Sequence, residues 1–426
     1  MALLKMIFLS PVRTSIGLSI ALLLSEILAS CQSDSNSKTT ATQAEKTPAS
    51  AVRRDTPGTW YRCYRGTLGP DSITLHLQTW PANRTSAVFV GSYSRADGQP
   101  HELGTEFDAV AKPDSVLVRD RDLEFSDATS SGPLWRLRLN GKELTGTWAG
   151  QQVQLREVQM PSSTSFLSRY FTDSVAAYSN KSKSVYGRTS LHTLEPANSP
   201  ESTRNALMAG ILRGLRGDTL DTQAVPASVQ QYWQQQLQNF QKEYQASVAG
   251  LLKSQPPEPD TSSNAPSYDY MLRYEDQVAT HVLWNQGNLL SLGFFTYSYT
   301  GGAHGNYGTR AVTYDARTGR ALRFTDIFRP NTTAQLSMLL EQAVRRALHQ
   351  PPTVRLDKFL FVEKMPVTHN VYLTSGGAVF IYTPYEIAAY AQGEIRLFVP
   401  LEQLRPLLKP GLPLSGGGEI SRQPAP

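Results

Sequence analysis

A β-hairpin is encoded most clearly by residues 135–148, which read WRLRLNGKELTGTW. Apolar and polar side chains alternate on both sides of Asn140-Gly141, as they do in a strand that buries one face. Asn-Gly suits the two positive φ angles of a type I′ turn, which joins neighbouring antiparallel strands. This stretch therefore predicts two paired strands, and the same pattern continues along the chain in the N-terminal direction.

The whole region 59–158 repeats this alternation without a helical pattern. It is found at residues 73–77, 88–90 and 116–118, and residues 96–98 (Ala-Asp-Gly) provide a second turn. We expect seven or eight antiparallel strands that curl or close into a small barrel, because closure removes exposed strand edges. The tryptophans of this region serve either as core packing or as an aromatic platform for a sugar or lipid. They are Trp60, Trp80, Trp135 and Trp148.

Region 159–280 combines helical and strand patterns. Its clearest element is a helix that begins near Pro226, with apolar residues recurring every three or four positions. The opposite face is rich in Gln, so we expect the apolar stripe to pack on a sheet. Residues 268–274 and 277–284 are expected to be strands. The stripe consists of Val229, Trp233, Leu237, Phe240, Tyr244, Val248 and Leu251.

Region 281–409 is expected to contain β-structure with one long helix. Tyr297 and Tyr299 alternate with Ser and Thr, which predicts a strand that ends at the glycine pair 301–302. Leu and Ala recur at helical spacing over residues 333–349. The chain therefore has the α+β fold class, with an N-terminal all-β meander or small barrel followed by an α+β region.

The first residues resemble a bacterial lipoprotein signal. Lys5 and Arg13 give a positive start, a short apolar core follows, and residues 28–31 (Leu-Ala-Ser-Cys) resemble the lipobox that is cut before its cysteine. The apolar run is shorter than the roughly 20 residues of a membrane-spanning helix. The resemblance implies that Cys31 is lipidated and anchors the chain in the cell envelope. Gln32, in place of Asp, favours the outer membrane, with the chain facing the periplasm or the surface.

These patterns predict six segments. The domain boundaries are a signal peptide at 1–30, a disordered tether at 31–58, an all-β domain at 59–158, an α+β domain with a long amphipathic helix at 159–280, a C-terminal α+β domain at 281–409, and a flexible tail at 410–426.

Charge and cysteine content exclude several classes of function. The 41 Lys and Arg and 36 Asp and Glu give a net charge of +5, and the regions 59–158 and 159–409 each mix both signs, unlike a nucleic-acid binder. With Cys31 lipidated, Cys63 has no partner for a disulfide, and we expect it to be a small buried hydrophobe. Zinc-hydrolase, serine-hydrolase and phosphate-loop motifs are absent. We expect no cofactor, no metal and no nucleic-acid partner.

An unusual passage lies at residues 297–305, which read YSYTGGAHG. Adjacent glycines let the backbone come close to a ligand or to a neighbouring chain segment. His304 can act near neutral pH in a binding site, or it can be tied to a backbone carbonyl in a tight structural connection. Both interpretations remain open at the level of sequence.

Three motifs of this half of the chain resemble one known family. They are YTGGAH at 299–304, FTDIF at 324–328 and YTPYEIAAYAQGE at 382–394. They resemble the C-terminal domain of the anti-sigma factor RsiV, which is also found in the polysaccharide deacetylase PdaC outside its catalytic module. The resemblance covers about 281–409, and the preceding region resembles the domain that commonly precedes it. It implies an extracytoplasmic α+β domain, which in RsiV recognises lysozyme.

Three hypotheses for function follow. The first is a non-catalytic, lipid-anchored envelope protein that recognises a peptidoglycan-like glycan or a protein. The second is an envelope polysaccharide hydrolase that uses His304 with a carboxylate such as Glu386 or Glu394, although Glu386 equally suits a turn in which it caps backbone N–H groups. The third is a lysozyme-binding sensor or inhibitor. The candidate ligand-binding residues are Tyr299, Gly301, Gly302, His304, Tyr382, Tyr385 and Glu386.

Overall fold

The computed structural model describes residues 55–82, 86–106, 114–121, 133–178, 185–218, 224–254 and 268–414. All of these belong to one compact unit, Arg53–Pro426. The expected signal peptide, the lipidation candidate Cys31, most of the expected tether and residues 415–426 of the expected tail lie outside the described residues.

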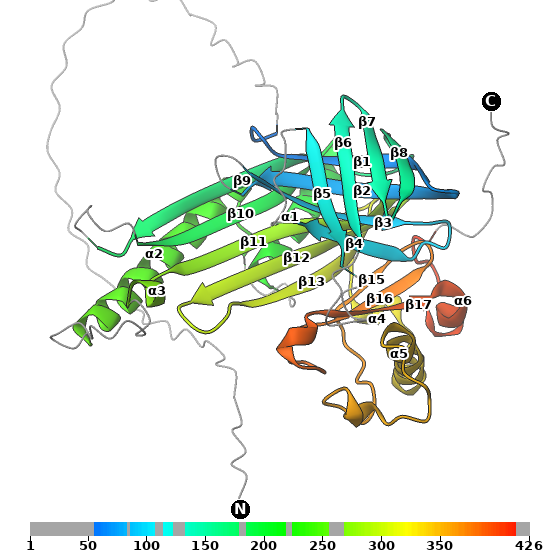
Figure 1. Ribbon diagram of the computed structural model, residues 1–426. Helices are drawn as coiled ribbons and strands as arrows, with labels where there is room; N and C mark the ends of the chain where they lie inside the picture. The colour runs from blue at the N-terminus through cyan, green and yellow to red at the C-terminus, as the bar shows by residue number, and fades with distance from the viewer. Residues whose placement is uncertain are drawn as a thin grey trace, which may run out of the picture. The chain divides into compact units, whose positions relative to one another are not determined.

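The N-terminal part is a closed eight-stranded antiparallel barrel, as the alternation predicted (Figure 1). β1 closes the ring by pairing with β8. The Asn-Gly turn joins β6 to β7 with Gly141 at a φ of +60°, and Gly98 of the second predicted turn has a φ of +70°. The strands are β1 (Trp60–Leu68), β2 (Asp71–Pro81), β3 (Ala87–Ser94), β4 (Pro100–Thr105), β5 (Ser115–Asp120), β6 (Leu134–Asn140), β7 (Glu143–Trp148) and β8 (Gln151–Glu157).

Side chains fill the interior of this barrel. Trp135 is 0% exposed and packs against Trp148, with ring centroids 5.7 Å apart. Trp60 packs edge-on against Phe89 at 6.2 Å. These contacts confirm the packing interpretation for the three tryptophans. Cys63 is buried as expected, and this burial raises the pKa of its thiol to about 12.

A six-stranded sheet follows the barrel, in the order β14-β13-β12-β11-β10-β9. β10 and β11 pair in parallel, and the other neighbours are antiparallel. The boundary expected between residues 280 and 281 lies inside β11, so both expected α+β regions contribute strands to one sheet. The strands are β9 (Ser165–Ala176), β10 (Tyr186–Ala197), β11 (Tyr274–Gln286), β12 (Leu289–Thr300), β13 (Asn306–Asp315) and β14 (Arg320–Leu322).

One strand prediction needs correction. Residues 268–274 contain the short helix α3 (Tyr268–Met271), and only Tyr274 joins β11. The N–H of Arg273 donates to the Tyr270 carbonyl at 3.2 Å, which closes a turn where a strand was expected. The aromatic content of this stretch favours a strand, but packing of its backbone against the turn at residues 301–305 overrides that weak preference.

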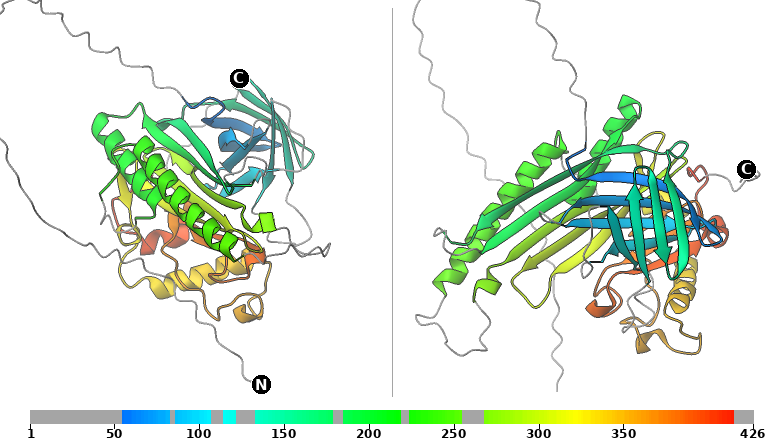
Figure 2. Two further views of the ribbon diagram at one scale, coloured as in Figure 1. Left: turned by 90° about the vertical axis from the view of Figure 1, so that its left-hand side faces the viewer. Right: turned by 45° about the horizontal axis from the view of Figure 1, so that its top comes forward.

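Two helices cover one face of the sheet (Figure 2). They are α1 (Glu201–Arg216) and α2 (Val229–Lys253), which is the predicted amphipathic helix. Ser228 caps α2 by accepting the N–H of Gln231 at 3.1 Å. Trp233 of α2 stacks on Phe171 of β9 at 5.7 Å, which confirms that the apolar stripe packs on a sheet. We call the opposite face of the sheet, which carries residues such as His281 and Tyr297, the open face.

A smaller three-stranded sheet completes the fold. It consists of β15 (Val371–Leu373), β16 (Gly377–Tyr382) and β17 (Ile395–Pro400), and α5 (Thr333–Ala347) packs on it, as expected for a helix over residues 333–349. The hydroxyl of Ser291 on β12 donates to the carbonyl of Leu373 at 2.7 Å, which joins the two sheets. The remaining short helices are α4 (Phe324–Ile327), η2 (Leu356–Lys358), η3 (Tyr390–Gln392), α6 (Leu401–Leu404) and η4 (Arg405–Leu407).

The barrel is fixed onto the open face at β11. The buried side chain of Gln78 donates to the Thr280 carbonyl at 2.9 Å and accepts the N–H of Val282 at 2.6 Å. Arg396 of β17 forms ion pairs with Glu102 of β4 and with Glu394. Among the described residues, the barrel therefore lies over one end of the open face and not over the other, as seen in Figure 1.

Candidate functional site: a tyrosine groove on the open face

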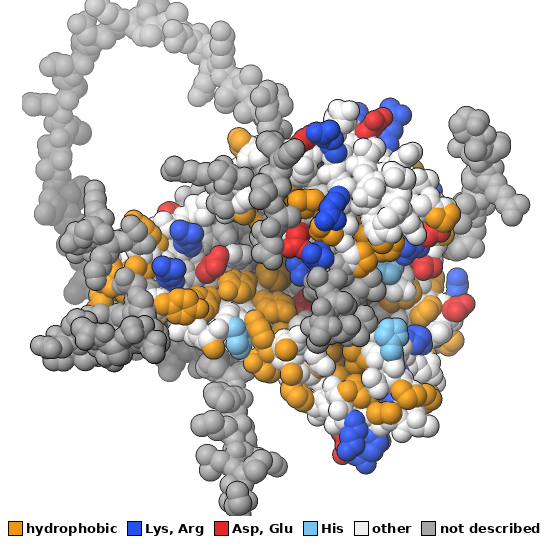
Figure 3. Space-filling view, viewed as in Figure 1, with side chains coloured by type: hydrophobic (Ala, Val, Ile, Leu, Met, Phe, Trp, Pro, Cys, Tyr) orange, Lys and Arg blue, Asp and Glu red, His pale blue; other side chains and the backbone are white. Residues whose placement is uncertain are grey.

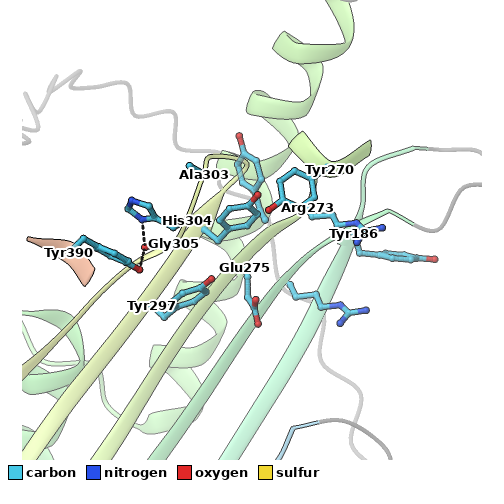
Figure 4. A pocket seen from close by; sticks show the side chains of 12 residues that line it. Tyr186, Tyr270, Arg273, Glu275, Tyr297, Ala303, His304, Gly305 and Tyr390 are labelled. Atoms are coloured by element: carbon cyan, nitrogen blue, oxygen red, sulfur yellow. Dashed lines mark hydrogen bonds between the residues drawn. The ribbon is translucent and has the colours of Figure 1, made fainter. Parts of the chain in front are cut away.

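A groove of about 660 Å³ lies on the open face, at the end of the strands away from the barrel (Figure 4). Its volume is in the range of roughly 300–1,000 Å³ that is usual for small-ligand pockets. Six tyrosines line it, and we therefore call it the tyrosine groove: Tyr186, Tyr270, Tyr274, Tyr297, Tyr299 and Tyr390. The other lining residues are Arg188, Arg273, Glu275, Ala303, His304 and Gly305.

Strand register brings the floor of the groove together. Tyr297 and Tyr299 are two positions apart on β12, so their side chains share one face. The antiparallel register places Gln277 opposite Tyr297 and Glu275 opposite Tyr299. The parallel register places Arg188 of β10 beside Glu275. The floor therefore joins aromatic and charged side chains from three strands.

The glycine-rich turn at residues 301–305 forms one wall. Gly301 has a φ of +80°, and a Cβ there would lie 2.4 Å from the carbonyl oxygen of Met271. A Cβ on Gly305 would lie 2.4 Å from the ring of Tyr297. The close approach that the glycines allow is therefore to the chain itself. Gly302 is exposed, and the nearest atom to a Cβ there would be 4.0 Å away.

His304 is exposed at the rim of the groove and held in place. Its ring stacks on Tyr390 with centroids 3.9 Å apart. Its Nδ1 lies 3.0 Å from the Gly305 carbonyl oxygen, and its Nε2 lies 3.4 Å from the Tyr385 hydroxyl. With the proton on Nδ1, the ring donates to the carbonyl and accepts from the tyrosine. Both ring nitrogens thus have partners in the chain, and the imidazole serves as a fixed stacking surface.

The other expected site residues have different positions. Tyr382 is 0% exposed and donates to the Pro366 carbonyl at 2.6 Å, so it is a core residue and not a ligand contact. Tyr385 is 55% exposed and lies beside His304. The carboxylate of Glu386 accepts the N–H of Thr383 at 2.9 Å, which is the turn-capping alternative. The structure therefore places Tyr299 and His304 in the groove and Tyr385 next to it.

Sequence patterns do not single out the charged residues of the groove. Arg188 and Arg273 are exposed, and within the described ranges neither guanidinium has an ion-pair partner. Glu275 is half-buried and accepts a hydrogen bond from the Gln277 amide. The density of tyrosines around residue 270 was the available signal. The parallel pairing of β10 with β11 joins segments that are far apart in sequence, and no local pattern encodes it.

The phenols of Tyr297 and Tyr299 in the groove remain protonated at neutral pH. Desolvation raises the pKa of Tyr297, and the nearby carboxylate of Glu275 adds to this. The pKa of Tyr299 is raised to about 12, by desolvation first and then by its interaction with Tyr270. The hydroxyl of Tyr299 donates to the Gly302 carbonyl at 3.0 Å, so this ring is held against the turn. The groove therefore presents aromatic rings with polar tips.

A row of aromatic rings runs along the open face from the groove to the barrel, with neighbouring centroids 3.9 to 6.4 Å apart. Figure 3 shows hydrophobic side chains gathered over this part of the molecule. At the barrel end, burial lowers the pKa of His192 to about 3. The row consists of Tyr385, His304, Tyr390, Tyr307, Phe295, His281, Trp80 and His192.

The described residues contain no group of three or more His, Cys, Asp or Glu side chains that is placed to hold a metal ion. None of the helices in the described ranges is long and apolar enough to cross a membrane.

Two family models match the C-terminal region. Residues 215–307 match the model described as "Deacetylase PdaC", and residues 325–402 match the "Protein of unknown function (DUF3298)". These matches confirm the resemblance to the RsiV/PdaC-like C-terminal domain and its usual preceding domain. The first includes the β11 and β12 strands of the groove, and the second includes α5 and the three-stranded sheet. The barrel lies outside both.

Solved structures of the DUF3298 family are similar to part of the chain. A family member from Bacteroides fragilis is 21% identical with a TM-score of 0.49, over 58% of this chain and 94% of that chain. A family protein from Pseudomonas aeruginosa is 20% identical with a TM-score of 0.39, over 58% of this chain and 97% of its own. No curated protein matches this chain.

Proposed function

We propose that this protein is a lipid-anchored, non-catalytic cell-envelope protein that binds a glycan in the tyrosine groove. The observation that carries the proposal is the groove itself: a concave space of about 660 Å³ in which six of the twelve lining residues are tyrosines. Aromatic rings with polar tips bind partners that are apolar on one face and polar at the edge. Sugar rings have this character, with C–H groups on their faces and hydroxyls around the rim.

Size and charge favour a glycan over a protein partner. Stable protein interfaces bury about 800 Å² on each partner, whereas this groove has the dimensions of a small-ligand site. A basic partner such as lysozyme would be attracted by an acidic surface. The groove instead carries Arg188 and Arg273 against the single carboxylate of Glu275.

The positions of the expected acid and base support binding without chemistry. Glu386 uses its carboxylate to cap a turn, and both nitrogens of His304 have partners in the chain. Glu394 accepts the N–H of Thr309 and pairs with Arg396, so it also holds structure. A general acid or base must reach the substrate proton that it transfers, and these groups face other partners.

Calorimetry with the full-length chain and the tetramer of N-acetylglucosamine tests this function. Tyr297→Ala should lower the affinity about tenfold, because a stacking contact of this kind is worth roughly 1 kcal/mol or more. Phe361→Ala is the matched control, because Phe361 is 63% exposed and lies outside the groove. Binding of peptidoglycan fragments should follow the same order. Failure of every glycan to bind, or an equal loss in both variants, would contradict the proposal.

Two further arms of this experiment separate the alternatives. Shortening of the tetramer during incubation would favour a hydrolase. Capture of lysozyme by the wild type but not by Tyr297→Ala would favour a lysozyme sensor or inhibitor. Under our proposal the tetramer is recovered intact, and lysozyme is not enriched.

We also propose that Cys31 carries the lipid and that the chain is held at the outer membrane, with the folded part facing the periplasm or the surface. The lipobox-like sequence before Cys31 supports this. Cys31→Ser should abolish incorporation of a labelled palmitate and release the chain from the membrane fraction. A variant that is still labelled would exclude this cysteine as the lipid acceptor.

A further inference from the structure

Two guanidinium groups that have no ion-pair partner within the described ranges line the tyrosine groove. Arg188 comes from the floor strand β10, and Arg273 comes from the segment between α3 and β11, where Figure 4 shows it next to Tyr270. Other exposed arginines, such as Arg317 and Arg355, bind a carboxylate only two residues away. The groove arginines have no such partner within the described ranges, and both line the groove.

The charges that face this space have a positive balance. Arg188 and Arg273 are two cations, and Glu275 is the carboxylate among the lining residues. Glu275 already accepts a hydrogen bond from Gln277, which uses part of its capacity as an acceptor. Guanidinium groups present paired donors in a plane that matches a carboxylate or phosphate, and charge-assisted bonds of this kind are the stronger ones.

We infer that the glycan bound in this groove is acidic, with a carboxylate received by Arg188 and Arg273 while its sugar rings stack on the tyrosines. This inference rests on the proposed function. A carboxylate fits better than a phosphate because Glu275 lies in the same groove, and its repulsion of a ligand grows with the charge of that ligand. The groove therefore selects among glycans by charge as well as by ring stacking.

The register of the sheet gives Glu275 a specific part in this selection. It stands beside Arg188 in the parallel β10–β11 pair. The negative charge of this carboxylate repels an acidic ligand bound at Arg188, so Glu275 limits the affinity. Glu275→Gln should therefore strengthen binding of acidic glycans several-fold and leave binding of neutral ones unchanged.

The experiment compares two probes on the full-length chain by calorimetry: the tetramer of galacturonic acid and the neutral tetramer of N-acetylglucosamine. The acidic probe should bind at least tenfold more tightly at low salt, and its advantage should shrink as salt is added. Arg188→Gln and Arg273→Gln should each reduce the advantage about fivefold, and together they should remove it. Arg136→Gln is the control, because Arg136 is exposed on the barrel and has no ion-pair partner in the described ranges.

The possible results separate this inference from the proposed function. Equal affinity for both probes, unchanged in the arginine variants, would overturn the charge selection and leave glycan binding intact. Failure of the wild type to bind either probe would overturn the two proposals together. An increase in affinity for the acidic probe alone in Glu275→Gln supports the inference even if an arginine variant fails to fold, and an unchanged affinity there counts against it.

Discussion

The open face of the six-stranded sheet has two halves that use similar residues for different purposes. Beneath the barrel, Trp80 stacks on His192 at 4.2 Å, and His192 bonds to the Ser168 hydroxyl at 2.9 Å. In the tyrosine groove, His304 stacks on Tyr390 at 3.9 Å, but this pair faces solvent. Both halves are aromatic surfaces with a histidine at their centre. The two halves differ in what covers them. The barrel covers one half, and in our proposal a glycan ligand covers the other.

Burial lowers the pKa values of the histidines in the covered half. His76 and His192 are only 1–2% exposed, and each has one ring nitrogen bonded within the chain. Burial lowers the pKa of His76 to about 4 and that of His192 to about 3. The half-buried His281, which faces His192, also has its pKa lowered to about 4 by burial. Protonation of these rings therefore lowers the stability of the covered half.

Acidification should produce the largest difference between the two halves, because it lowers the stability of the covered half. A histidine whose folded pKa is depressed stabilises the fold above its unfolded value of about 6.5, and it loses that contribution as pH falls toward the folded value. For His76 and His192 the window runs from about 6.5 down to the folded values of about 4 and about 3. We expect the free energy of unfolding to fall by about 2 kcal/mol per histidine between pH 7 and pH 5. Urea denaturation at several pH values measures this.

Two variants separate the buried histidines from other sources of pH dependence. His192→Gln keeps a side chain that can bond to Ser168 but cannot titrate, so its stability should depend less steeply on pH. His304→Gln alters the exposed histidine of the other half and should keep the wild-type slope. If all three proteins show one slope, the covered half is not the acid-sensitive part.

The next largest loss of stability should come from removing the hydrogen bonds of Gln78, which join the barrel to β11. Gln78→Leu leaves the Thr280 carbonyl and the Val282 N–H buried without their partner. An unsatisfied buried group costs about 1–3 kcal/mol, so we expect a loss of roughly 2–4 kcal/mol in the free energy of unfolding. Gln154→Leu on β8 is the exposed control and should change stability by less than about 0.5 kcal/mol. A Gln78 variant as stable as this control would show that the barrel is held by other contacts.

Much of the fold can be predicted from the sequence because its signals are local. Alternation with an Asn-Gly turn encodes the barrel, and a single apolar stripe encodes α2. The shared sheet could not be predicted, because the parallel pairing of β10 with β11, which sets Arg188 beside Glu275, joins segments separated by three helices. No local sequence pattern predicts that β10, from one expected domain, pairs with β11 in the sheet of the next.

The candidate site was predicted only in part, for a related reason. The motif at residues 297–305 lies in the wall of the groove, where Gly301 and Gly305 allow close packing against the chain itself. Tyr382 belongs to another of the family motifs, but it ends the strand β16, which is buried at every position, and its side chain lies in the core of the smaller sheet. The groove arginines lie on exposed positions with no periodic signal at all.

A substitution in the tyrosine groove should have a smaller effect, and it should weaken glycan binding without lowering stability. Tyr270 is 49% exposed and touches Tyr299 edge-on at 5.9 Å. Tyr270→Ala should change the free energy of unfolding by no more than about 0.5 kcal/mol and weaken glycan binding by about 1 kcal/mol. Tyr314→Ala, at a 1% exposed position on the helix-covered face, should destabilise the fold by about 3 kcal/mol or more. The reverse pattern would mean that the groove is a structural surface and not a binding site.

The smallest effect concerns the turn that carries Tyr385 beside the groove. Glu386 accepts the N–H of Thr383, and Tyr385 between them has the strained φ of +70°. Glu386→Gln weakens this cap without removing it, so we expect a loss of only about 0.5–1 kcal/mol in stability and less than a twofold change in glycan affinity. Glu363→Gln, at a side chain that is 78% exposed, is the matched control for loss of one negative charge. A collapse of binding in Glu386→Gln but not in Glu363→Gln would move Glu386 from the turn into the site, and it would revive the acid–base pair with His304 that the present geometry disfavours.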